Sequence, residues 1–232
     1  MALSYCSQLR KGIALPITVA VLFAFIASLS GAGLLNCLLP STLYNTLCTL
    51  STISGNVEVQ NAESNILQEG TDGMTLRAGD RVKTTPDSYA VVTFFEGSTI
   101  KLEPNTDVEI QRLEHVGEQS VKILLKQWLG KSRSHVEKMA NPGSYYEIQT
   151  PSASVIVMGT LFVTGVDEAG STIVQTIEGL VTVAAQNAEL NVPAGYESRA
   201  ELGSVPSQPI LFELPGQSDE GPPGQSDEGP PR

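Results

Sequence analysis

Two histidines, His115 and His135, are the side chains best suited to acid–base chemistry near neutral pH, because an imidazole titrates in that range. Neither has the context that catalysis needs: the chain has no G-x-S-x-G elbow, no H-E-x-x-H motif and no phosphate-binding glycine loop. We therefore predict that both histidines are surface residues, that the protein is not an enzyme, and that it uses no cofactor.

Four carboxylates gather in one short stretch, and carboxylate oxygens are the ligands that calcium prefers. They are Glu96, Glu103, Asp107 and Glu109. Their spacing matches no loop with established ligand positions, so a solvated strand face is the better interpretation. The sequence predicts no metal site.

A basic group stands out against the acidic chain, which has 25 acidic and 14 basic residues and a formal net charge of -11. Its members are Lys122, Lys126, Lys131, Arg133 and Lys138. They could form an interaction patch for an anionic envelope polysaccharide, lipid headgroups or an acidic partner. Alternatively, they keep an exposed strand soluble and unpaired. The overall charge argues against nucleic acid as a partner.

The three cysteines, Cys6, Cys37 and Cys48, all lie in the first fifth of the chain. The long remainder can therefore have neither an internal disulfide nor a thiolate metal site. Many glycines, valines and threonines indicate an all-β body with an ordinary hydrophobic core.

The front of the chain is typical of a membrane segment, because residues 12–40 carry no charge and exceed the length that a helix needs to cross a bilayer. Arg10 and Lys11 precede this segment, which predicts a cytoplasmic N-terminus and an extracytoplasmic body. The small residues Ser30-Gly31-Ala32 also permit signal-peptide cleavage, but we favour a retained anchor. Within that anchor, Gly31 and Gly33 would allow close packing of a second helix.

The body alternates short apolar runs with turn residues about every ten positions, which predicts a sandwich, a roll or a short β-solenoid-like domain. Within it, residues 121–138 suggest a strand, a turn near Gly130 and a second strand. We predict five segments: a cytoplasmic N-terminus (1–11), a single transmembrane helix (12–40), a linker (41–53), the β-domain (54–212) and a disordered acidic repeat tail (213–232).

Two stretches carry a family resemblance. They are "LRAGDRVKTTPDSYAVVTFFEGSTIKL" and "YEIQTPSASVIVMGTLFVTGVDEAGSTIVQTIEGLVTV", the latter followed by "VPAG". In this order they resemble the FecR-type domain of bacterial envelope proteins, over residues 54–196. Family members commonly have arginine before the Gly-Thr pair, whereas Met158 precedes Gly159 here. The short predicted cytoplasmic segment also lacks room for the domain with which the founding regulators control a sigma factor.

The resemblance implies an extracytoplasmic sensor, relay or protein-interaction module, anchored in the bacterial cytoplasmic membrane and contacting another membrane or envelope protein. The alternative is a structural or adhesive envelope protein that binds a surface polymer. Whether a sigma-factor pathway is involved stays open at this point.

Overall fold

The computed structural model describes residues 46–116, 120–141 and 143–212. Every regular element in this part of the chain is a β-strand, so the predicted all-β class is confirmed. Three predicted segments lie outside the described residues: the cytoplasmic N-terminus, the transmembrane helix with Gly31 and Gly33, and the tail. Among the residues that are described, no helix is long and apolar enough to cross a membrane.

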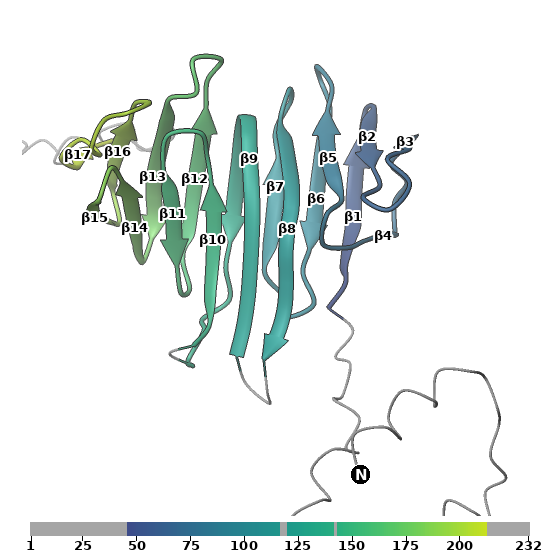
Figure 1. Ribbon diagram of the computed structural model, residues 1–232, viewed down its shortest axis with the longest axis horizontal. Helices are drawn as coiled ribbons and strands as arrows, with labels where there is room; N and C mark the ends of the chain where they lie inside the picture. Colours follow the sequence, from purple (N-terminus) through teal and green to yellow (C-terminus); the bar gives the residue numbers. More distant parts are fainter. Residues whose placement is uncertain (1–45, 117–119, 142, 213–232) are drawn as a thin grey trace, which may run out of the picture. The chain divides into compact units, whose positions relative to one another are not determined.

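The strands form two layers, called here sheet A and sheet B (Figure 1). Sheet A has the order β4-β1-β6-β7-β9-β12-β13-β16-β17. Besides β9 (Ser120–His135), its strands are β1 (Cys48–Ser54), β4 (Met74–Leu76), β6 (Tyr89–Thr93), β7 (Thr99–Leu102), β12 (Leu161–Val166), β13 (Thr172–Glu178), β16 (Tyr196–Ala200) and β17 (Ile210–Leu211).

Sheet B has the order β3-β2-β5-β8-β9-β10-β11-β14-β15. Besides β9, its strands are β2 (Val57–Gln60), β3 (Leu67–Glu69), β5 (Arg81–Thr84), β8 (Asp107–Val116), β10 (Tyr145–Gln149), β11 (Ser154–Val157), β14 (Leu180–Ala185) and β15 (Ala188–Pro193). The pairing of β9 with β10 is parallel, whereas its pairing with β8 is antiparallel. The sheet is therefore mixed.

Strand β9 belongs to both sheets. Its first half pairs with β8 and β10 in sheet B, and its second half pairs with β7 and β12 in sheet A. The change occurs at Gly130, which has a φ of 88°. A Cβ atom there would lie 2.5 Å from the carbonyl oxygen of Asn105 and from the Cα of Thr106. Only glycine fits this close approach, and the predicted turn near Gly130 is a crossing between layers.

A buried glutamine stabilises this crossing. The side-chain amide of Gln127 donates to the carbonyl oxygen of Gly130 at 2.8 Å and to that of Thr164 at 3.2 Å. Its own oxygen accepts a hydrogen bond of 2.7 Å from the hydroxyl of Ser132. A fully buried amide is tolerated because both ends are satisfied.

The core lies between the two sheets, where alternate residues of each strand point inward, as the period-two pattern predicts. At its centre, Tyr146 of sheet B reaches across to sheet A. Its ring meets Phe94 and Phe162 edge to face, at centroid distances of 5.8 and 6.3 Å. Its hydroxyl lies 3.2 Å from that of Ser134. These contacts fix the two layers face to face.

The folded domain begins earlier than predicted, since Cys48–Ser54 is strand β1 rather than part of a linker. Cys48 and Leu50 are fully buried in the core. This neutral stretch follows directly on a long apolar segment in the sequence, and that continuity hid its alternation. The predicted linker over 41–53 is therefore corrected for its second half.

Candidate interaction surface

The predicted basic group does not form one surface, because β9 changes sheets in the middle of it. Lys122 and Lys126 lie on the outer face of sheet B, where β9 pairs with β8. Lys131 and Arg133 are exposed on the outer face of sheet A, with buried serines alternating between them. Lys138 follows the end of β9, next to Gly159. The single patch predicted from the sequence is therefore wrong.

On sheet B, the lysines of β9 face acidic and aromatic side chains. Glu114 is the cross-strand partner of Lys122, and Glu109 is that of Lys126. The ammonium of Lys126 also lies 3.7 Å from the ring centroid of Trp128, and that of Lys122 lies 5.9 Å from the ring centroid of Tyr145. Neighbouring charges and π-faces thus compensate these cations.

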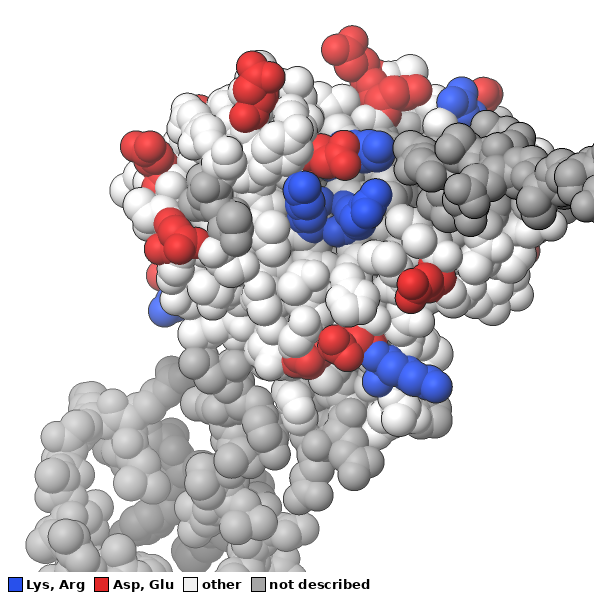
Figure 2. Space-filling model, turned by 180° about the vertical axis from the view of Figure 1, so that it is seen from behind, with Lys and Arg blue, Asp and Glu red and all other residues white. Residues whose placement is uncertain are grey.

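On sheet A, three cations gather: Lys101, Lys131 and Arg133 are called here the cationic patch. The ammonium of Lys101 lies 5.0 Å from the ring centroid of Tyr89. Lys101 and Arg133 are direct cross-strand partners, an arrangement that costs stability because like charges meet. Lys131 lies 3.7 Å from Glu103, whereas Arg133 forms no ion pair within the described residues. Figure 2 shows this basic cluster near the middle of the face, beside an acidic side chain.

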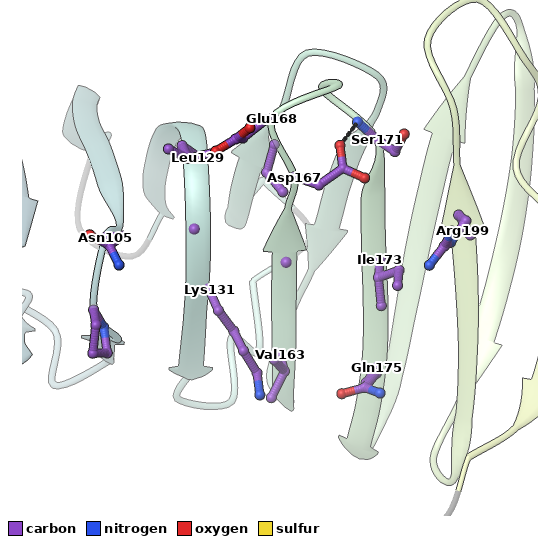
Figure 3. A pocket seen from close by; sticks show the side chains of 14 residues that line it. Asn105, Leu129, Lys131, Val163, Asp167, Glu168, Ser171, Ile173, Gln175 and Arg199 are labelled. Atoms are coloured by element: carbon purple, nitrogen blue, oxygen red, sulfur yellow. Dashed lines mark hydrogen bonds between the residues drawn. The ribbon is translucent and has the colours of Figure 1, made fainter. Parts of the chain in front are cut away.

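A groove adjoins the cationic patch, with a volume of about 870 Å³ (Figure 3). Its floor follows β12, where Val163 and Gly165 point outward. Lys131 of β9 lies on one bank. On the other bank, Ile173 of β13 and Arg199 of β16 are direct partners. The groove is open above Gly165, where a Cβ atom would meet nothing within 4 Å.

Acidic side chains close one end of the groove. Asp167 and Glu168 occupy the turn between β12 and β13, and both line the groove. The carboxylate of Asp167 accepts a hydrogen bond of 2.8 Å from the backbone of Ser171, which fixes the turn. The groove therefore has a cation on each bank, Lys131 and Arg199, and an anionic end.

The structure separates the residues considered for catalysis. His135 is exposed on the outer face of sheet A, beside Thr99 and Leu161. His115 lies on β8 with its ring centroid 6.2 Å from that of Phe95. The two histidines therefore do not share a site.

The predicted carboxylate group is dispersed as well. Asp107 forms a bidentate ion pair with Arg81, at 2.5 and 2.7 Å, and Glu103 contacts Lys131. Glu109 faces Lys126 across β8 and β9, and Glu96 lies at the turn between β6 and β7. In the ranges that the structure describes, no group of three or more His, Cys, Asp or Glu is placed to hold a metal ion.

Glu96 is the least accommodated carboxylate. Both of its oxygens are buried and have no well-formed hydrogen bond in the described part of the chain, although the neighbouring Ser98 offsets part of the effect of burial. Burial raises the pKa of Glu96, and the charge of Glu137 adds to the increase. Burial also raises the pKa of the Cys48 thiol to about 12, with further contributions from Asp80 and Glu96.

Sequence reasoning missed two parts of the surface. Lys101 and Arg199 are distant from the basic group along the chain, and only strand pairing brings them to the cationic patch and the groove. The groove lies over Gly165, whose sequence context looks like that of any strand glycine. A usable signal was "FVTGV", an apolar strand with a glycine at an outward position.

Residues 80–182, which run from the start of β5 into β14, match the model of the family described as FecR protein. This part of the chain is a FecR-type domain. The match includes β7, β9, β12 and β13, so it contains the cationic patch and most of the groove. No curated protein matches the chain significantly in a sequence search.

The solved structures that are similar to the chain include two from one organism. Both are crystal structures described as a "putative anti-sigma factor" from Parabacteroides distasonis, with TM-scores of 0.45 and 0.46 and sequence identities of 15% and 16%. Each alignment covers 55% of this chain and 59% of the anti-sigma factor chain in the crystal structure, so the chain spans about three-fifths of each neighbour's length.

Proposed function

We propose that this FecR-type domain is a relay module that works outside the bacterial cytoplasmic membrane and contacts another membrane or envelope protein through the outer face of sheet A. The observation that carries the proposal is the cationic patch, in which Lys101 and Arg133 meet as cross-strand partners, beside an open groove that lies mostly within the family match. A like-charge cross-strand pair lowers fold stability, so its presence is better explained by a partner that supplies the counter-charge.

In this proposal the domain is tethered by the predicted membrane helix, and a second membrane protein carries the signal inward. Gly31 and Gly33 would then contact the helix of the membrane partner. The pathway ends, by the family resemblance, in sigma-factor-dependent transcription.

Crosslinking in intact cells tests the relay. A photoreactive residue in place of Thr99, which lies beside the cationic patch, should capture a membrane or envelope protein. Arg133→Glu in the same chain should abolish the capture. Bulky substitutions of Gly31 and Gly33 should reduce transcription from the promoter that the proposed sigma-factor pathway controls. Capture that persists with Arg133→Glu would refute sheet A as the contact surface.

Topology is tested separately. An impermeant thiol reagent should label a cysteine introduced at the exposed Ser204 and spare Cys6 in intact cells, with any outer membrane opened. The reverse labelling pattern would contradict an extracytoplasmic domain.

A specific observation favours a second function, the binding of an envelope polysaccharide through sheet B. Trp128 is 38% exposed on that face, and Tyr145 lies beside Lys122. Exposed aromatic rings with basic neighbours suit the stacking of sugars that carry acidic groups. Trp128→Ala should then release the protein from isolated cell-wall polymer, whereas Arg133→Glu should leave that binding unchanged.

A further inference from the structure

One row of cross-strand partners defines the middle of the groove. Gly165 of β12 pairs with Lys131 of β9 on one side and with Ile173 of β13 on the other. Ile173 pairs in turn with Arg199 of β16. Neighbouring strands lie about 4.8 Å apart, so these two cations start about 14 Å apart, with the glycine between them. An anionic group above Gly165 would therefore meet a cation from each side (Figure 3).

Both cations of this row are accessible to a ligand. Arg199 is exposed and forms no ion pair within the described residues. Lys131 lies 3.7 Å from Glu103, but the two side chains keep 52% and 30% of their surface exposed. An ion pair of this exposure is weak, so a competing carboxylate can replace Glu103. The row thus offers two positive charges to a single anionic group.

The anionic end of the groove lies one strand repeat beyond this row. Asp167 follows Gly165 by two residues, a step of about 6.6–6.8 Å along an extended chain, and Glu168 comes next. Both side chains are exposed, and neither forms an ion pair in the part of the chain that the structure describes. This end therefore attracts a positive group and repels a second carboxylate.

The floor on the other side of the row is apolar. Val163 lies two residues before Gly165 and lines the groove, as Ile173 does on the bank. Gln175 is the polar neighbour, and its amide already donates to Glu197 at 2.7 Å. Along its length the groove thus changes from anionic to cationic to apolar, with one change at every second residue of β12.

We infer that the groove binds an extended segment of the partner protein that carries a basic, an acidic and an apolar residue at alternate positions. An extended peptide has the required spacing, because its alternate side chains point to the same side. The basic side chain lies against Asp167 and Glu168. The carboxylate lies between Lys131 and Arg199, and the apolar side chain covers Val163. This inference rests on the proposed function and names the chemistry of the partner.

Fluorescence anisotropy at low salt, with the full-length protein in mild detergent, tests the order of charges. The probe, called here the mixed-charge peptide, is a blocked and labelled lysine-serine-glutamate-serine-valine. Two matched probes carry two glutamates or two lysines in place of its charged pair. The mixed-charge peptide should bind at least about tenfold more tightly than either, because each matched probe places one charge against a like charge. Absent binding, equal affinities or a preference for a matched probe would overturn the inference.

Charge reversal at two points in the groove should remove one half of this selectivity at a time. Glu168→Lys should abolish the preference over the two-glutamate probe and retain the preference over the two-lysine probe. Arg199→Glu should do the converse. Glu189→Lys and Arg112→Glu make the same charge changes at exposed positions of sheet B, and they should leave all three affinities unchanged. If these control variants lose selectivity to the same extent, net charge explains the binding and the inference fails.

Gly165→Leu locates the peptide in the groove. The space above Gly165 is open, so leucine fills the groove without a clash, and the affinity for the mixed-charge peptide should fall at least about tenfold. Circular dichroism establishes that each variant is folded. Unchanged affinity in the folded Gly165→Leu variant would place the peptide elsewhere and overturn the inference.

Crosslinking in intact cells separates this inference from the proposed function. Capture of an envelope protein through Thr99, together with no binding of the mixed-charge peptide, would retain the relay and remove the groove ligand. Selective binding of the mixed-charge peptide without a captured protein would retain the groove ligand and remove the relay.

Discussion

The two halves of β9 carry the same kinds of basic residue into very different surroundings. In sheet B, Lys122 and Lys126 have glutamate partners on β8 and aromatic rings beside them. In sheet A, Arg133 has Lys101 as its partner and no acidic residue in contact within the described chain. Cross-strand neighbours, rather than the charges themselves, decide which half is available to a ligand.

This difference teaches how one strand can serve two purposes. On sheet B the cations are part of the structure, because they neutralise acidic neighbours and cover aromatic surface. On sheet A, Lys101 and Arg133 meet as like charges, and Arg133 forms no ion pair within the described residues, which is the observation behind the proposed contact surface. The bend at Gly130 separates the two groups of cations, since it places the two halves of β9 on opposite outer faces.

The largest expected effect follows from removing the bend. Gly130→Ala should destabilise the domain by at least about 3 kcal/mol, because alanine adds left-handed strain and a clash with the backbone of Asn105 and Thr106. Chemical denaturation measures the loss. Gly203→Ala is the control, since its φ is 77° but its surroundings are open. A similar, small loss in both variants would contradict the close approach.

Charge reversal should separate the two halves of β9. Lys126→Glu should destabilise the domain by about 1 kcal/mol, because it faces Glu109 and loses the contact with Trp128. Arg133→Glu should instead stabilise it by about 0.5 kcal/mol, because it relieves repulsion with Lys101. Thermal melts at low salt provide the comparison. A stability change of the same sign in both variants would contradict the distinction between the two faces.

The turn that holds Glu96 should give the stability of the domain a pH dependence that neither outer face explains. Because the pKa of Glu96 is raised in the folded state, folding favours its protonated form. The contribution of Glu96 to the free energy of unfolding is therefore most favourable below the ordinary glutamate pKa. It is lost as the pH rises through the raised pKa. Glu96→Gln should be more stable than the parent at pH 7, and this advantage should shrink on acidification.

Urea titrations across that pH range measure the Glu96 effect. Glu114→Gln is a suitable control, because Glu114 is a partly exposed carboxylate on sheet B. An advantage of Glu96→Gln that grows toward acid pH would refute the raised pKa.

The smallest expected effect is chemical. Cys48 should resist alkylation by iodoacetamide at pH 8 in the native protein, since burial raises its pKa to about 12 and closes access. Mass spectrometry of the peptide that contains Cys48 should detect modification only after denaturation. Rapid native labelling would mean that β1 is not held in sheet A.

The sequence predicted the fold class and most inward residues, because period-two alternation records burial directly. Val57, Val82 and Ile100 are examples, and all three are buried. It missed β1, whose alternation is masked by the apolar stretch before it. It could not predict that Lys131 and Lys126 separate, because strand pairing is non-local and only the pairing shows that Gly130 changes the sheet.

The shared strand also has a mechanical consequence. Two independent sheets can slide past one another at little cost, as in shear motions between packed layers. Here β9 is one continuous chain through both layers, and Gln127 ties the crossing to β12. Sliding of sheet A over sheet B would therefore strain β9 at Gly130 and break the hydrogen bond of Gln127 to Thr164, so the shared strand resists shear between the layers.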